Sequence, residues 1–264
     1  MLRMLLCTIL LTTSFVCSAA DAQQGGKETL TVLSSGGIMG AIREVAPAYE
    51  KRYGVKLEVV AAPSMGETPQ AVPNRLARGE PADVVLMVGS ALDNLVTNGQ
   101  ADKASRIDLG KSFIAMAVRK GEPKPDIGTL QASRTVLQNS RSVAYSDSAS
   151  GVYLSKTLFP RMQLGDQFKS KALMIPAEPV GAVIARGQAQ IGFQQLSELK
   201  PVKGIDIVGL IPAEAQKMTM YSGAAVNKSQ HHAAAQALLD YLASPAADAA
   251  ITDSGLTPLP HTAS

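Results

Sequence analysis

The sequence has few of the residues that build covalent or metal centres. Its 264 residues include two cysteines, no tryptophan, 4% aromatic residues and three histidines. Both cysteines, Cys7 and Cys17, lie in the first 22 residues, and the histidines are His231, His232 and His261. A disulfide scaffold, a zinc site of ordinary ligand spacing and ligand capture by aromatic stacking are therefore excluded.

An excess of one charge is also missing. The 25 basic and 22 acidic residues leave a net charge of +3, and no run of lysine and arginine could follow a phosphate backbone. Nucleic acid is therefore not expected as a partner. Gly110-Lys111-Ser112 lacks the first glycine of a P-loop, and Ser35–Gly40 keeps only half of the dinucleotide fingerprint. We expect no cofactor and no metal.

The chain begins with a segment typical of a secretory signal. Arg3 provides a positive start, Met4–Val16 is a mostly apolar run too short to span a bilayer, and small residues follow up to Ala22. A lipid anchor on Cys17 would require a small residue just before it, where a valine stands. We therefore predict that residues 1–22 are a cleaved signal peptide and that the mature chain is periplasmic.

Beyond this segment, apolar β-branched runs alternate with segments of helical periodicity, which is typical of an α/β fold. Strands are predicted at Thr29–Leu33, Lys56–Val60, Asp83–Met87, Phe113–Val118, Ser142–Ser146, Ile191–Gln195, Ile205–Leu210 and Met218–Val226. Helices are predicted at Ile38–Tyr53, before Arg78-Gly79, and at Ala91–Asn98, Ser150–Phe159, Pro179–Arg186, His231–Leu242 and Ala246–Asp253. The first strands and helices imply a parallel sheet. The pattern restarts after Gly110 without a linker, which indicates two lobes joined by crossing strands.

Four loops lie at strand ends and open helices: Ser34–Gly37, Ser64–Gln70, Asp147–Gly151 and Pro176–Val180. The first N–H groups of a helix are unpaired and carry a positive partial charge, so such loops can bind anions. In open α/β sheets, ligands bind at these carboxyl ends. One loop of this kind is usually an ordinary turn. Four of them, two in each predicted lobe, indicate an anion-binding cleft.

The order and spacing of these elements resemble the periplasmic solute-binding proteins of the molybdate-binding type over nearly the whole mature chain. The resemblance rests on LTVLSSGGIMGAIREVAPAYEKRYGVKLEVV, RLARGEPADVVLM, SASGVYLSKTLF, PAEPVGAVIARGQAQIGF and ALLDYLASPAADAAITDSGL. It implies the type II periplasmic-binding-protein fold, in which an anion is trapped between two lobes. We expect residues 23–112 and 219–264 in lobe 1 and residues 113–218 in lobe 2, with crossings near Leu109–Phe113 and Met218–Ser222.

The resemblance also implies ligand positions in lobe 1. The position after the first strand that usually offers a ligand serine matches Gly37, with Ser34 and Ser35 just before it as substitutes. The second ligand serine falls in an altered, longer segment that contains Ser64 and Thr68.

In lobe 2, the resemblance matches two backbone donors to Ser150 and Val180. The position of a ligand tyrosine hydroxyl matches Gln195, with Gln194 as a weaker candidate. Because an amide both donates and accepts hydrogen bonds, this change suits an organic carboxylate better than a tetrahedral metal oxyanion.

These features leave two functions open. In the first, the chain binds a small anion, an organic (poly)carboxylate rather than molybdate, and passes it to a membrane permease. In the second, it is an enzyme, because this divergent branch also resembles the periplasmic aconitate isomerases. That resemblance implies a cofactor-free allylic proton shift that interconverts trans- and cis-aconitate. The family pattern favours the binding protein modestly.

The isomerase hypothesis requires a base and donors for carboxylates. Glu67 and Asp147 lie in the predicted cleft loops and are candidate bases, while Arg75 and Arg78 are candidate partners of a carboxylate. Each has a structural alternative: a solvated loop residue for Glu67, a helix cap for Asp147 and a solvated helix face for the arginines. No sequence signal indicates an obligate oligomer, so we expect a monomer.

Overall fold

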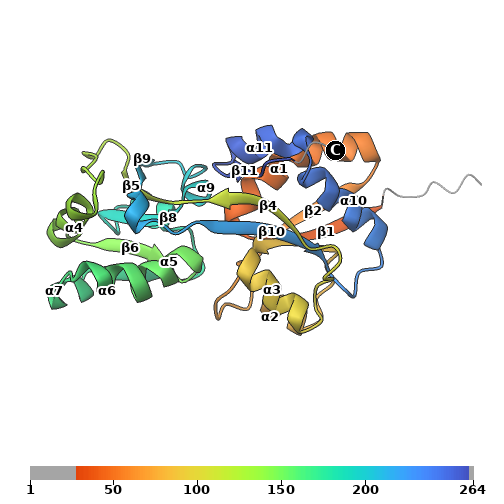
Figure 1. Cartoon of the computed structure of the whole chain (residues 1–264), viewed down its shortest axis with the longest axis horizontal. Coiled ribbons are helices and arrows are strands. Elements are labelled where there is room, and N and C mark those ends of the chain that lie inside the picture. Colours follow the sequence, from red (N-terminus) through yellow and green to blue (C-terminus); the bar gives the residue numbers. More distant parts are fainter. Residues whose placement is uncertain (1–27, 262–264) are drawn as a thin grey trace, which may run out of the picture.

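The computed structural model describes residues 28–261, which form two β-sheets flanked by helices (Figure 1). The predicted signal peptide, residues 1–22, lies outside the described residues. Between residues 28 and 261, none of the helices is long and apolar enough to cross a membrane. The alternating pattern therefore correctly predicts a mixed α/β fold.

The first sheet has six strands in the order β11-β4-β10-β3-β1-β2. They are β1 (Thr29–Ser34), β2 (Lys56–Ala61), β3 (Val84–Val88), β4 (Ile107–Ser112), β10 (Thr219–Ala225) and β11 (Thr257–Pro258). β1 pairs in parallel with β2 and β3, which confirms the predicted parallel arrangement, whereas β10 joins β3 and β4 antiparallel. Every residue of the apolar β3 is buried, so the core of this half lies around the sheet centre.

Helices cover both faces of the first sheet. They are α1 (Gly36–Tyr53), α2 (Val72–Ala77), α3 (Gly89–Thr97), α10 (His232–Leu242) and α11 (Asp248–Asp253), with a 3-10 turn at Pro245–Ala247. Figure 1 shows α1, α10 and α11 on one side and α2 and α3 on the other. The apolar residues Ile38, Ile42 and Val45 form the buried face of α1, and Gly54 ends this helix in the left-handed conformation at φ 71°.

The second sheet has five strands in the order β7-β6-β8-β5-β9. They are β5 (Ile114–Arg119), β6 (Val143–Ser146), β7 (Ala172–Ile175), β8 (Ile191–Gln195) and β9 (Ile205–Leu210). The helices of this half are α4 (Leu130–Asn139), α5 (Ala149–Tyr153), α6 (Phe159–Met162), α7 (Asp166–Lys169), α8 (Val180–Ala185) and α9 (Leu196–Leu199). β6 pairs in parallel with β7 and β8, and β5 pairs antiparallel with β8 and β9.

The helix predicted at Ser150–Phe159 is less regular than expected. A π-helical turn, Leu154–Leu158, separates α5 from α6. Leu154 and Leu158 are buried, so the wider turn keeps apolar side chains on the core side of the helix. π turns of this kind are frequent near functional sites.

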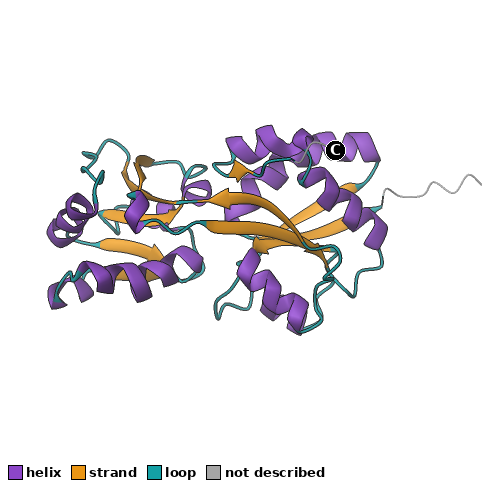
Figure 2. Cartoon of the chain, in the orientation of Figure 1, coloured by secondary structure: helices purple, strands orange, loops and turns teal. Residues whose placement is uncertain are grey.

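The chain passes between the two sheets at two places. β4 belongs to the first sheet and β5 to the second, with only Phe113 between them. The return path runs from β9 through a 3-10 turn at Ala213–Ala215 to β10. Gln216 ties this return segment to β5. Its side chain accepts the main-chain N–H of Ile114 at 2.8 Å and donates to the Ile114 main-chain oxygen at 2.9 Å. Figure 2 shows β4 and β10 as long neighbouring strands that run toward the second sheet.

Candidate functional site

The carboxyl end of β1 carries buried hydroxyl groups. Ser34 Oγ donates to the main-chain oxygen of Ser35 at 3.2 Å. Ser35 is 4% exposed, and its Oγ has no hydrogen-bond partner of good geometry among the described residues. Ser35 does not cap α1 with its side chain, and the first turn of α1 has no acidic residue. This helix end therefore offers unpaired N–H groups and a positive partial charge.

Gly37 allows a tyrosine from another strand to reach this helix end. A Cβ atom at Gly37 would lie 2.0 Å from the hydroxyl oxygen of Tyr221 on β10, so no larger residue fits. Burial and the negative charge of Glu198 raise the pKa of Tyr221 well above its usual value, and the neighbouring Ser35 hydroxyl opposes part of this rise. Tyr221 therefore stays protonated and can donate a hydrogen bond.

Two buried glutamines end β8 and have different partners. Gln194 Oε1 accepts the main-chain N–H of Val180 at 2.9 Å, so the backbone donor predicted at Val180 is already paired. Gln195 Nε2 donates to Thr219 Oγ1 at 2.8 Å, while Gln195 Oε1 is buried without a partner among the described residues. The Gln195 amide is thus held in place with a free acceptor.

Glu198 brings a carboxyl group to the same place. It lies on α9, which begins where β8 ends and packs against α1. Its Oε2 atom is buried without a partner among residues 28–261, and a Cβ atom on Gly36 would lie 2.9 Å from its Oε1 atom. Desolvation by burial raises the pKa of Glu198 from 4.5 to about 7, although the Gln195 main chain and the Gln194 side chain lower it in part. This carboxyl group therefore titrates near neutral pH.

Ser64 and Thr68 form contacts within the loop that carries them. Ser64 is buried, and its Oγ accepts the main-chain N–H of Val88 at 2.9 Å, which ties the loop to the end of β3. Thr68 is half-buried, and its Oγ1 accepts the main-chain N–H of Gln70 at 3.3 Å. Its main-chain oxygen accepts from the side-chain amide of Asn74 at 2.8 Å. These contacts shape the loop before α2.

The same loop reaches the second sheet. A Cβ atom at Gly66 would lie 3.1 Å from Asp147 Oδ2, so the loop and the start of α5 lie side by side. Asp147 is half-buried, whereas Glu67 is exposed. Ser150 is buried, and its Oγ lies 3.4 Å from Ser146 Oγ. The structure thus places Asp147 and Ser150 next to the contact between the two halves and leaves Glu67 in solvent.

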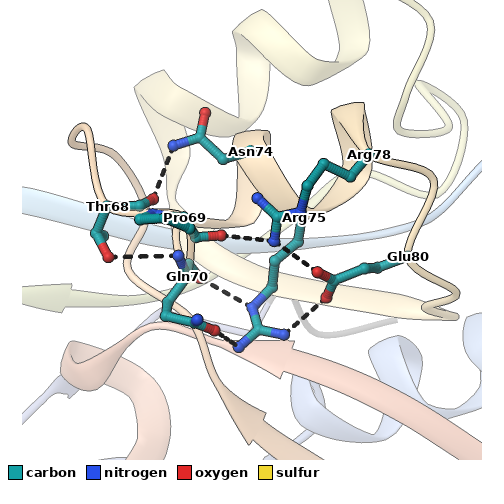
Figure 3. Close-up of polar contacts among 7 residues, drawn as sticks. All are labelled: Thr68, Pro69, Gln70, Asn74, Arg75, Arg78 and Glu80. Atoms are coloured by element: carbon teal, nitrogen blue, oxygen red, sulfur yellow. Dashed lines mark hydrogen bonds and ion pairs between the residues drawn. The ribbon is translucent and has the colours of Figure 1, made fainter.

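Arg75 and Arg78 brace the loop before α2 (Figure 3). Arg75 donates to the main-chain and side-chain oxygens of Gln70 and pairs with Glu80 at 2.7 Å. Arg78 donates to the main-chain oxygen of Pro69 at 2.7 Å and pairs with Glu80 at 2.5 Å. Hydrogen bonds from Arg78 and Arg75 lower the pKa of Glu80. Both guanidinium groups therefore have partners within this segment.

Sequence reasoning missed Glu198, Tyr221 and Thr219. A signal for Glu198 was available, because it closely follows the strand Ile191–Gln195 and ligands bind at the carboxyl ends of strands in α/β sheets. Tyr221 and Thr219 lie on the predicted strand Met218–Val226. Only the antiparallel pairing of this strand between β3 and β4 brings its beginning to the end of β1.

The side chains of Ser35, Glu198 and Tyr221 meet at the amino end of α1, and Gln195 lies at the end of β8, where the α9 helix of Glu198 begins. We call them the Glu198 cluster. They provide a titrating carboxyl group, a protonated phenol, a hydroxyl and an amide acceptor. Within residues 28–261, no group of three or more His, Cys, Asp or Glu side chains could hold a metal ion. The cluster can hydrogen-bond a carboxylate and can accept or return a proton.

Comparison with known proteins identifies a family and a close relative of this chain. Residues 30–257 match the model of a family described as bacterial extracellular solute-binding proteins. Over 232 residues the chain is 74% identical to a protein of Pseudomonas sp. named aconitate isomerase, and the match covers 88% of each chain.

Solved structures of low sequence identity share the fold. The periplasmic molybdate-binding protein of Azotobacter vinelandii is 19% identical with a TM-score of 0.72, and the match covers 88% of this chain and 100% of that one. The sulfate-binding protein of Mycobacterium tuberculosis is 20% identical with a TM-score of 0.69, covering 88% and 87%. These likenesses confirm the predicted binding-protein fold. Because the family model spans most of the sequence, the chain belongs to the bacterial extracellular solute-binding proteins.

Proposed function

We propose that this chain is an aconitate isomerase, which interconverts trans- and cis-aconitate by moving a proton within the substrate. The observation that carries the proposal is the 74% identity over 232 residues to the protein of that name. The Glu198 cluster supports it, because an allylic proton shift needs a titrating group and neutral hydrogen-bond donors for the carboxylates.

The substrate of this proposal is a small tricarboxylate bound between two lobes, residues 23–112 with 219–264 and residues 113–218. One carboxylate lies at the amino end of α1, where helix N–H groups and the positive helix end favour an anion. The hydroxyl groups of Ser35 and Tyr221 donate to it, and the side chain of Gln195 orients a second carboxylate. Asp147 and Ser150 line the opposite wall, beside the loop at Gly66.

The reaction takes place in the periplasm, after residues 1–22 have been removed as a signal peptide. The family description as extracellular proteins supports this location. The chain works as a monomer. Since the reaction turns one soluble acid into another, it requires no permease. A protein that only captures an anion would instead need a permease to pass it on.

Proton NMR of the purified mature protein tests the proposal directly. With trans-aconitate in large molar excess and a metal chelator present, cis-aconitate should accumulate over many turnovers. A sample of the protein inactivated by heat serves as the control. If no cis-aconitate forms, while trans-aconitate or another small anion raises the melting temperature, the chain is a binding protein and the proposal is wrong.

A further inference from the structure

Glu198 has an unusual environment for a carboxylate. Its Oε2 atom is covered by protein and has no hydrogen-bond partner among the described residues. Hydrogen bonds from the Gln195 main chain and the Gln194 side chain relieve only part of the cost of burying this group. A buried carboxyl oxygen without a donor disfavours the charged form, so a folded protein seldom keeps one without a functional reason. The Oε1 atom faces Gly36, which is exposed.

Among residues 28–261, no cation contributes to the pKa of this carboxyl group. Burial is the leading influence on its proton affinity, and the other influences come from the amide groups of Gln194 and Gln195. The titratable neighbour is Tyr221, which stays protonated. Lys200, on the adjoining turn, is exposed and donates to the main-chain oxygen of Asp253 at 2.6 Å. Glu198 is therefore a carboxyl group that exchanges a proton rather than half of an ion pair.

The position of Glu198 fits a substrate bound at the end of α1. A carboxylate at this helix end would lie beside Gly36 and Gly37, with the Tyr221 hydroxyl next to Gly37 and the Glu198 carboxyl next to Gly36. The Tyr221 hydroxyl donor and the Glu198 base would thus contact the substrate beside two neighbouring residues of the first turn of α1. Such proximity is the geometric requirement for proton transfer to or from a bound molecule.

We propose that Glu198 is the catalytic acid–base residue that removes a proton from one allylic carbon of aconitate and returns it to the other. The inference rests on the proposed isomerase function and deepens it. Neither Glu67 nor Asp147, the candidate bases from the sequence, has an unpaired buried carboxyl oxygen among the described residues.

The proton shift balances without a redox partner. Glu198 takes a proton from the methylene carbon, and the electron pair of that C–H bond forms a new double bond to the central carbon. The electrons of the old double bond move toward the former vinylic CH carbon and its carboxylate. The protonated carboxyl group, which exchanges its proton with solvent in a fraction of the turnovers, then gives a proton to that carbon. The product has the same formula, and the new double bond takes the other geometry without rotation about the old one. The Tyr221 and Ser35 hydroxyl groups stabilise the charge that develops on the carboxylates.

The Glu198→Gln variant tests the inference. Its turnover of trans-aconitate, followed by proton NMR, should fall by about a thousandfold, since positioned acid–base groups contribute 10²–10⁴ in rate. Exchange of the methylene protons with deuterated solvent should fall equally. Binding of trans-aconitate, measured by calorimetry, should change by less than about tenfold because glutamine keeps the shape of the side chain. The matched control is Glu44→Gln, an exposed carboxylate on α1, which should behave like wild type.

The pH dependence of kcat/KM gives a second readout. In the wild-type protein the rate should rise with pH through about 7, as a carboxyl base with this pKa loses its proton. Glu198→Asp keeps the carboxyl group but withdraws it by one methylene, so it should retain a reduced rate with a rising pH profile. This variant decides the question if Glu198→Gln fails to fold.

The outcomes separate the inference from the proposed function. A wild-type protein that isomerises aconitate, together with a folded Glu198→Gln variant of undiminished rate, overturns the role of Glu198 and leaves the isomerase standing. A wild-type protein that neither isomerises aconitate nor exchanges its methylene protons overturns both. Loss of turnover and of exchange with binding retained supports both.

Discussion

A carboxyl group lies at each end of the first sheet, and the two groups differ in their hydrogen bonding and in the direction of their pKa shifts. At the amino end, Asp83 just before β3 is 8% exposed and fully paired. At the carboxyl end, Glu198 is half-buried, and its covered Oε2 atom has no partner among the described residues. The pKa of Asp83 is lowered, whereas that of Glu198 is raised to about 7.

Hydrogen bonds account for the difference. Asp83 Oδ2 accepts the main-chain N–H of Thr31 at 2.8 Å, and its Oδ1 accepts the Ser229 hydroxyl at 2.6 Å and contacts His231 Nδ1 at 3.1 Å. Burial alone would raise the pKa of Asp83, but the bonds from Ser229, Thr31 and His231 outweigh it. We call these four residues the Asp83 latch. A carboxylate is thus structural where donors satisfy both of its oxygens, as at Asp83, and titrates near neutral pH where one covered oxygen lacks a donor among the described residues, as at Glu198.

Breaking the Asp83 latch should have the largest effect on stability. Asp83→Asn places an amide N–H against the N–H of Thr31 and removes the charge that the other donors stabilise. We expect the free energy of unfolding at pH 7 to fall by about 3 kcal/mol, as for other broken buried networks. Urea denaturation measures this loss. Asp93→Asn, an exposed partner of Arg106, is the control and should lose less than about 1 kcal/mol.

The pH dependence of the stability of wild type and of Asp83→Asn tests whether the charge of Asp83 causes this loss. The folded-state pKa of Asp83 is lowered from its ordinary 3.8, so its stabilisation is present above that value and is lost as the pH falls through the folded-state pKa. The difference between wild type and Asp83→Asn should therefore shrink in acid. A difference that stays constant from pH 7 into the acid range would contradict the electrostatic explanation.

Removing the charge at the opposite end should stabilise the protein. The folded-state pKa of Glu198 is raised from 4.5 to about 7, so ionisation costs the wild type stability progressively between these pH values. Glu198→Gln carries no such cost and should be more stable by about 2 kcal/mol above pH 7, with little difference near pH 4. Equal stability at pH 8 would show that the carboxyl group is well solvated. A gain in stability with a loss of turnover would show that the site exchanges stability for function.

The Thr219→Val variant tests whether the Gln195 side chain must be held in one orientation for substrate binding. Thr219 Oγ1 accepts a hydrogen bond from the Gln195 side-chain amide at 2.8 Å. Without this acceptor the Gln195 amide loses its fixed orientation, and we expect KM for trans-aconitate to rise about tenfold, the value of one hydrogen bond. Steady-state kinetics with Thr219→Ser, which keeps the hydroxyl, provides the control. Identical KM values for the two variants would remove Gln195 from substrate binding.

The smallest effect on KM is expected for Arg75 and Arg78, which belong neither to the Glu198 cluster nor to the Asp83 latch. Arg75 and Arg78 have Glu80 and loop carbonyl groups as partners, so Arg75→Gln and Arg78→Gln should each change KM by less than about fivefold, as expected for ion pairs near the surface. A loss of a hundredfold or more in kcat/KM would show instead that these arginines bind a substrate carboxylate when the two halves close on it.

The sequence predicts β1 and α1 well, since the apolar pattern is strong over Thr29–Ser34 and Gly36–Tyr53. It misses the parallel strand β7, which is only four residues long, and the helix α4. It fails for β4, because Asp108, Gly110 and Lys111 interrupt the apolar pattern of a strand that crosses between sheets. It also fails for α9, which is too short to show a helical period.

The residues of the candidate site also fall into those that the sequence predicts and those that it does not. Ser35, Gln195 and the glycine at position 37 follow from loops at strand ends and from the family pattern. Glu198 and Tyr221 do not, because their roles depend on burial and on the packing of α9 and β10 against α1, which lie far apart in the sequence. Long-range packing of this kind leaves no local pattern.

The strand order of the first sheet also governs when the sheet can form. β10 lies between β3 and β4, and Ser229 reaches Asp83 across 146 residues of sequence. Contacts of such high order form slowly, because a long chain must close before they add stability. A nascent chain that ends before residue 219 leaves β3 and β4 without the strand that joins them. Truncated or stalled chains therefore expose one edge of β3 and both edges of β4, whose partners β10 and β11 are missing, and such edges are the surfaces through which incomplete β-proteins aggregate.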